Sequence, residues 1–146
     1  MNYLPNIKNA TLLSVEDVLT YTTADLRKYL GWWWIKSSSL YPSAAAIVDF
    51  DGAIYYSNEY SNNIYYVRPV LEIELDPNKF NHIGGYFLFG DKVFKIISDN
   101  LAFCTEDIGR CCFREDSTAE DAHDYETSDI KKFIDTWFIK AMQEEE

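Results

Sequence analysis

The sequence has few of the residues from which catalytic and nucleic-acid-binding sites are usually built. It contains two histidines and three cysteines in 146 residues, and only 13 lysines and arginines against 24 aspartates and glutamates. The formal net charge of -11 argues against binding to a phosphate backbone, because such surfaces gather Lys and Arg where counterions are released. We therefore expect no direct contact with nucleic acid.

Long hydrophobic runs are also missing. No stretch reaches the roughly 18 apolar residues of a transmembrane helix, and residues 1–5 lack the order of a secretion signal. The odd number of cysteines, two of them adjacent, favours free thiols at Cys104, Cys111 and Cys112. Together these absences predict a reduced, cytoplasmic protein without a membrane segment.

The residues that are present suffice for one domain. Apolar residues make up 47% of the chain and aromatic residues 16%, and no linker or repeat divides residues 1–146. Three helical stretches are predicted: one from Val15 with Ser14 as its cap, one over residues 24–30 with Thr23 as its cap and Gly31 as its terminator, and one from Ser128 onward with Thr127 or Ser128 as its cap. The last is amphipathic.

Strand-like patterns fill the rest of the chain. The predicted strands are residues 32–35, a hairpin over 45–56 with its turn at Asp51-Gly52, a long strand over 64–75, a hairpin over 86–97, and residues 101–103. Pro69 places the long strand at an edge or a bulge. This order predicts an α+β domain, with a single twisted and mostly antiparallel sheet flanked by helices.

Two sequence blocks carry a resemblance. The block Trp32-Trp33-Trp34-Ile35-Lys36-Ser37-Ser38 resembles W-W-L-R-S, and Val67-Arg68-Pro69-Val70-Leu71 resembles V-R-P-A-L, in an uncharacterised bacterial and phage domain family. That family is similar in fold to C-type lectins and formylglycine-generating enzymes. The resemblance implies a C-type-lectin-like fold and an origin in a phage or another mobile element.

The order of the motifs differs from the family's. Residues 12–17 are similar to its F-L-L-S-x-E-E step and residues 128–134 to its S-x-I-R-x-W-L-N helix, which in the family comes first and here comes last. The resemblance therefore implies a circular permutation. Lys36 and Lys131 replace family arginines, and lysine does not reproduce a bidentate fork, so an ion pair built on those arginines is lost or redesigned.

Arg68 and Trp33 are predicted to be structural. An arginine between Val67 and Pro69 on a core strand is suited to hold a neighbouring loop through a carboxylate or backbone carbonyls, although ligand binding is the alternative. Successive side chains of a strand face opposite ways, so the three tryptophans of the block cannot all share one face. We expect the tryptophans to belong to the aromatic core.

Two surfaces are candidates for binding a partner. We call residues 106–129 the acidic segment, because they hold nine carboxylates against two arginines. It is either a solvated loop or a surface for a basic protein. The tyrosine-rich stretch around Asn58, Asn62 and Asn63 is either a plain hairpin or a recognition surface, since tyrosine and asparagine suit recognition. The predicted partner-binding residues are Glu115, Asp116, Glu120, Asp121, Asp124, Glu126, Tyr55, Tyr60 and Tyr65.

Catalytic and metal-binding patterns are weak. His82 and His123 lack the spacing of a zinc site, so His123 is expected in a loop. A copper pair like that of formylglycine-generating enzymes would need Cys104 and a second thiolate to converge in an open pocket. Asp76-Pro77-Asn78 is similar to the calcium and sugar motif of C-type lectins, but its W-N-D partner is absent. We expect no cofactor and no metal.

These patterns favour a non-enzymatic protein-binding module. One version is an acidic inhibitor of a host nucleic-acid enzyme, in which carboxylates stand where phosphates would lie, as an anti-defence protein would use. The alternative is a small-ligand-binding or formylglycine-generating-enzyme-like protein, which a concave pocket with convergent polar groups would favour.

Overall fold

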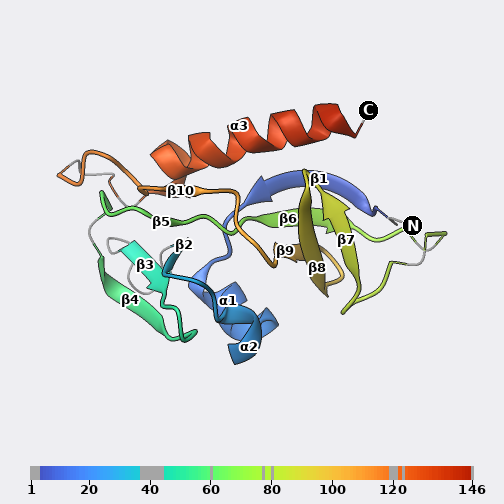
Figure 1. Cartoon of the computed structure of the whole chain (residues 1–146), viewed down its shortest axis with the longest axis horizontal. Coiled ribbons are helices and arrows are strands. Elements are labelled where there is room, and N and C mark those ends of the chain that lie inside the picture. The colour runs from blue at the N-terminus through green and yellow to red at the C-terminus, as the bar shows by residue number, and fades with distance from the viewer. Residues whose placement is uncertain are drawn as a thin grey trace.

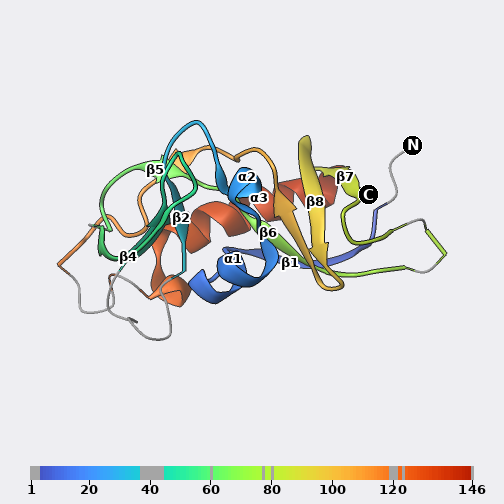
Figure 2. The ribbon, with the colours of Figure 1, turned by 90° about the horizontal axis from the view of Figure 1, so that it is seen from below.

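Two five-stranded sheets lie next to each other along the long axis of the molecule (Figure 1). The computed structural model describes residues 4–36, 45–59, 61–76, 78–79, 81–118, 122 and 124–145. Within these residues the chain forms a single small α+β domain of ten mostly antiparallel strands with few helices. Figure 2 shows the same two sheets from below.

The first sheet has the strand order β1-β6-β9-β8-β7, and all its neighbours are antiparallel. Its hairpin was predicted correctly, because the turn at Gly90 and Asp91 has positive φ angles of 57° and 62°, as a two-residue hairpin turn requires. The strands are β1 (Asn6–Thr11), β6 (Val70–Glu74), β7 (Tyr86–Phe89), β8 (Lys92–Ser98) and β9 (Leu101–Cys104).

The second sheet has the order β10-β5-β2-β3-β4. Its hairpin also follows the prediction, with Gly52 at a positive φ of 92° in the turn. One pairing is parallel, between β2 and β5, where Trp33 lies opposite Tyr66. The strands are β2 (Trp33–Ile35), β3 (Ala45–Val48), β4 (Ile54–Glu59), β5 (Tyr65–Tyr66) and β10 (Arg110–Cys111).

The helices begin at the predicted caps. The hydroxyl of Ser14 accepts from the Asp17 amide at the start of α1 (Val15–Tyr21), and Thr23 does the same for α2 (Ala24–Arg27). Ser128 caps α3 (Asp129–Glu144), which follows the 3-10 helix η1 (Tyr125–Thr127). None of the helices in the described residues is both long and apolar enough to cross a bilayer.

The prediction that the second helix extends to Leu30 is wrong. Helix α2 ends at Arg27, and Gly31 does not have the positive φ of a helix terminator. The amide of Tyr29 donates instead to the Phe50 carbonyl at 3.2 Å, and the Trp33 indole donates to the Arg27 carbonyl at 3.0 Å. Neither bond is part of the helical pattern, and they draw the chain away from the helical path.

Helix α3 runs along one side of both sheets (Figure 1). Its buried residues Ile130, Ile134 and Ala141 join the larger of two apolar cores. Near its C-terminal half, the Trp137 ring lies 5.7 Å from Phe89, next to the turn at Gly90. The amphipathic pattern of this segment was therefore interpreted correctly.

The tryptophan block contributes to both cores, as strand alternation predicts. Trp34 belongs to the core under α3, whereas Trp33 belongs to a second core with Val15, Val18 and Phe103 on the other side. Both indoles are fully buried. The second sheet is thus covered on both faces at β2.

The long strand and the single sheet were predicted incorrectly. Residues 64–75 form two short strands, β5 in the second sheet and β6 in the first, separated by Val67, Arg68 and Pro69. Strand β6 lies between β1 and β9, so it is not an edge, and Pro69 precedes it rather than interrupting it. Because proline has no amide donor, the ladder breaks here and the chain passes from one sheet to the other.

Candidate functional site

Three aromatic side chains form a row on the second sheet. Trp32 stacks on Tyr55 of β4, with ring centroids 6.1 Å apart, and contacts Tyr65 of β5, with ring centroids 5.5 Å apart. Tyr55 is 48% exposed, and Trp32 and Tyr65 are half-buried. We call these three residues the aromatic row. Tyr60, also predicted to bind a partner, lies outside the described residues.

The acidic segment is folded where it is described. The Arg114 guanidinium donates to the Thr127 carbonyl at 2.7 Å, and the Glu115 amide donates to the Asp129 carboxylate at 2.7 Å. Both bonds tie the loop to the start of α3. The exposed carboxylates of this loop are Glu115, Asp116, Asp124 and Glu126, while Glu120 and Asp121 lie outside the described residues.

Two of these carboxylates also shape the loop. Asp116 accepts from the amide and hydroxyl of Thr118, and Asp124 accepts from the amide of Glu126. Each bond uses one oxygen of a side chain that remains exposed. The charges are therefore held in place and still face solvent, which supports both interpretations offered by the sequence.

The structure brings the aromatic row and the acidic segment to the same end of the molecule (Figures 1 and 2). Ring contacts connect them: Tyr65 lies 4.9 Å from Trp34, Trp34 lies 5.6 Å from Phe113, and Phe113 lies 6.5 Å from Tyr125. Phe113 and Tyr125 belong to the acidic segment. The two candidate surfaces thus share an aromatic base.

Arg68 lies at the junction of the two sheets and is 1% exposed. Its guanidinium donates to the carbonyls of Leu26 at 3.1 Å and Arg27 at 3.5 Å. The guanidinium carbon is 4.7 Å from the Trp33 ring and 4.4 Å from the Phe103 ring. These contacts hold the chain after α2 and leave no open site around Arg68.

The cysteines are free thiols, but they do not form an open pair. Cys104 is fully buried, and burial raises the pKa of its thiol to about 12. Burial likewise raises the pKa of Cys111 to about 12 and shifts that of Cys112 upward. Protonated thiols are poor metal ligands and nucleophiles.

Histidine and carboxylate groups do not converge on a metal site in the part of the chain that is described. No group of three or more His, Cys, Asp or Glu side chains there is arranged to hold an ion. His123 of the acidic segment and Pro77 of the Asp76-Pro77-Asn78 motif lie outside that part.

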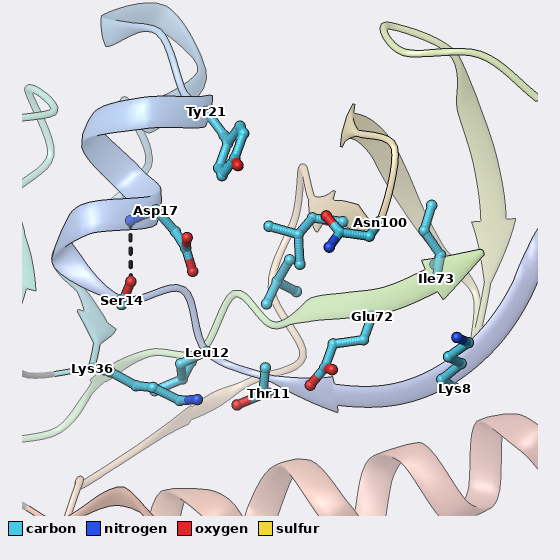
Figure 3. A pocket seen from close by; sticks show the side chains of 12 residues that line it. Lys8, Thr11, Leu12, Ser14, Asp17, Tyr21, Lys36, Glu72, Ile73 and Asn100 are labelled. Carbon is cyan, nitrogen blue, oxygen red and sulfur yellow. Dashed lines mark hydrogen bonds between the residues drawn. The ribbon is translucent and has the colours of Figure 1, made fainter. Parts of the chain in front are cut away.

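A polar pocket of about 390 Å³ lies between α1 and the face of the first sheet turned away from α3 (Figure 3). Asp17 and Tyr21, one helical turn apart, line it from α1. Glu72 of β6 and Asn100 line it from the sheet. The remaining lining residues are Lys8, Thr11, Leu12, Ser14, Lys36, Val70, Ile73 and Leu101.

Lys36 occupies one end of this pocket. Its backbone is fixed because its amide donates to the Leu13 carbonyl at 2.9 Å, next to a bridge with Ser14. Its ammonium lies 4.7 Å above the Tyr125 ring. Burial lowers the pKa of Lys36, partly offset by the nearby carboxylates of Glu126, Glu72 and Asp17.

Sequence reasoning did not identify this pocket. Its charged residues at positions 8, 17, 36 and 72 come from four separate parts of the chain, and no spacing rule connects them. In the sequence, Lys36 is notable only because it replaces an arginine of the family motif. The pairing of β1 with β6, which creates the pocket floor, has no local sequence signal.

Comparisons with known proteins identify no relative: no family model matches the chain, and no curated protein or solved structure is significantly similar to it. Function is therefore inferred from the geometry of the surfaces described above.

Proposed function

We propose that this chain is a non-enzymatic protein-binding module of the cytoplasm, which holds a basic protein at the end formed by the aromatic row and the acidic segment. One observation carries the proposal: the aromatic row, in which Tyr55 is 48% exposed, and the fixed, exposed carboxylates of the acidic segment belong to the same end of the molecule, where β4, β5 and β10 lie (Figure 1). Rings supply contact area, and carboxylates select a partner of opposite charge.

The charge of the chain determines the kind of partner. The net charge of -11 repels acidic proteins and nucleic acids and attracts a basic surface over about one Debye length, roughly 8 Å at physiological salt. The described carboxylates at positions 115, 116, 124 and 126 add a local excess of negative charge. A basic protein is therefore the complementary occupant.

We further propose that the partner is a nucleic-acid enzyme, which this chain inhibits. The basic surfaces of such enzymes are built to receive regularly spaced phosphates. Carboxylates held by hydrogen bonds, as Asp116 and Asp124 are, offer fixed negative charges to the same surface. An origin in a phage or mobile element would fit such an inhibitor.

The C-type-lectin-like and circularly permuted fold also stays a proposal. Two observations support it: the Arg68 guanidinium lies 4.7 Å from the Trp33 ring, so the two motif blocks meet, and β1 begins at the end of the molecule where α3 finishes (Figure 1). Permutation requires that the original ends can be joined at the surface. A variant that opens near Gly84 and links Glu145 to Leu4 should keep the native stability.

The alternative, an enzyme similar to formylglycine-generating enzymes, has less support. Its copper pair needs two thiolates in an open pocket, whereas Cys104 is fully buried with a pKa raised to about 12. A small-ligand role is better supported by the polar pocket beside α1.

A charge-matched pair of variants tests the binding surface. The first neutralises the four described carboxylates of the acidic segment: Glu115→Gln, Asp116→Asn, Asp124→Asn and Glu126→Gln. The Asn and Gln side chains keep the hydrogen-bond acceptors of the loop. The control removes the same charge from exposed sites elsewhere: Asp25→Asn, Asp99→Asn, Glu144→Gln and Glu145→Gln.

Partners are captured from a cell lysate with each protein, and the purified partner is then titrated at low and high salt. We expect capture by the native and control proteins, and an association rate lowered about tenfold in the first variant at low salt. Tyr55→Ala should speed dissociation, whereas Tyr86→Ala at the far sheet should not. Equal binding by both charge variants would refute the proposed surface.

A further inference from the structure

The pocket beside α1 carries opposite charges on its walls that are not paired with one another. Lys36 lies at one end, and Asp17 and Glu72 line the pocket as well (Figure 3). No salt bridge joins Lys36 to a carboxylate of the described residues. Lys8, the other cation of the pocket, is already held by Glu74 at 3.2 Å.

The Lys36 ammonium is poorly compensated as it stands. The side chain is half-buried, and its ammonium rests 4.7 Å above the Tyr125 ring, a weaker partner than a carboxylate. Burial lowers the pKa of Lys36 for the same reason, because the charged form has lost part of its hydration. An anionic group entering the pocket would compensate the Lys36 ammonium for the hydration that burial removed.

The carboxylates of the pocket complement a cation. The carboxylate of Asp17 points into the pocket from α1 (Figure 3), while its amide is bound by the Ser14 hydroxyl at 3.1 Å. Glu72 reaches in from β6, and its carboxylate accepts a hydrogen bond from the Asn9 side-chain amide at 3.3 Å. Both keep acceptor capacity for an ammonium group.

Neutral polar groups complete the lining. The Asn100 side-chain oxygen accepts from the Ser98 hydroxyl at 2.8 Å, which leaves the amide nitrogen to donate into the pocket (Figure 3). Tyr21 and Thr11 add hydroxyl groups. Such groups orient a ligand once its charges are matched.

We propose that this pocket binds a small zwitterion of the α-amino acid class, with its carboxylate at Lys36 and its ammonium at Asp17 and Glu72. A ligand with only negative charge would bring that charge near two carboxylates. A ligand with only positive charge would leave Lys36 uncompensated and repelled. The volume of about 390 Å³ suits a small molecule. None of the residues lining this pocket belongs to the surface proposed to bind a protein, although Lys36 adjoins that surface through Tyr125 and Glu126.

The test uses L-alanine as the probe, with propionate and ethylamine as analogues that each carry one of its two charges. Binding to the isotope-labelled protein is followed through the amide NMR signals of Asp17, Lys36 and Glu72. We expect L-alanine to shift these signals in a saturable way, and each analogue to bind at least about tenfold more weakly, equal to about 1.4 kcal/mol.

Three variants locate the charges. Lys36→Met and Asp17→Asn should each weaken L-alanine binding at least about tenfold. Lys8→Met is the matched control and should change binding less than about twofold, because Glu74 already holds its ammonium. The spectra themselves show whether each variant is folded, and a variant that does not fold is replaced by Lys36→Gln or Asp17→Ser.

Three outcomes would overturn the proposal. The first is the absence of any saturable shift in the pocket with L-alanine, glycine, L-glutamate or L-lysine up to about 10 mM. The second is propionate binding as tightly as L-alanine, which would make this an anion site. The third is ethylamine binding as tightly, which would make it a cation site.

Discussion

Replacing Arg68 tests what holds the two sheets together. The guanidinium is buried without a carboxylate partner within the described residues, and its Nε atom there has no hydrogen-bond partner. Burial lowers the pKa of Arg68 to about 10, so it is charged at neutral pH and carries a desolvation penalty of several kcal/mol. The packing of the Arg68 side chain therefore stabilises the fold, whereas its buried charge destabilises it.

Three substitutions change the packing and the buried charge to different extents. Arg68→Ala leaves a cavity among the rings of Tyr29, Trp33 and Phe103, and should lower the free energy of unfolding by about 3–5 kcal/mol. Arg68→Met fills most of that space. It leaves the Leu26 carbonyl without its donor, at about 1–3 kcal/mol, but also removes the buried charge.

The carbonyl of Arg27 keeps a partner in every variant, because the Trp33 indole also donates to it at 3.0 Å. We therefore expect Arg68→Met to lie within about 1 kcal/mol of the native protein. Arg68→Lys keeps the charge without the fork that reaches two carbonyls, and should be less stable than Arg68→Met.

Urea unfolding followed by tryptophan fluorescence measures all three variants. The expected order of stability is native and Met variant together, then Lys, then Ala. If the Met variant were as unstable as the Ala variant, the hydrogen bonds to the carbonyls rather than the packing would hold the junction, and the reasoning would be refuted.

Three further predictions concern other parts of the fold. Gly90→Ala should lower the free energy of unfolding by about 2–4 kcal/mol, because a Cβ there meets the Ala141 Cβ and Trp137 Cζ2 atoms at 2.9 Å at a φ of +57°. Gly84→Ala, with positive φ but open space, should lose only about 1–2 kcal/mol in the same urea assay, and equal losses would contradict the clash. Alkylation without reductant should label three cysteines in the unfolded chain, and in the folded chain the buried Cys104 should be labelled last. Intact mass counts the labels, and a single label on the unfolded chain would mean a disulfide. Because burial raises the pKa of Cys104 and Cys111 from 9.0 to about 12, the folded state retains protons that the unfolded chain releases. The thiol contribution to stability should thus be complete below pH 9 and fall as the pH rises toward 12. The urea midpoint measured against pH should fall less steeply in Cys111→Ala than in the native protein. An equal slope in the two proteins would contradict this prediction.

The local elements of this fold could be predicted from sequence because their signals are local. Ser14, Thr23 and Ser128 are caps that act within three residues, and Asp51-Gly52 and Gly90-Asp91 set their own hairpins. These signals correctly located the starts of three helices and the turns of two hairpins.

The long-range features had no such signal. The alternation of residues 64–75 suggested one strand, but it could not show that the two halves pair with β10 and β9 in different sheets. The early end of α2 depends on Phe50, which lies in a later hairpin, and on the Trp33 indole, which turns back to the Arg27 carbonyl. Nor could sequence show that Tyr125 supports both Lys36 of the pocket and the acidic segment.

The position of Arg68 has a consequence for how the molecule unfolds. Trp33 comes from the second sheet and Phe103 from the first, and both rings lie against the same guanidinium. Separating the sheets would expose that shared cluster to water. We therefore expect the two sheets to unfold as one cooperative unit, with the amides of β3 and β8 exchanging with solvent through the same global transition.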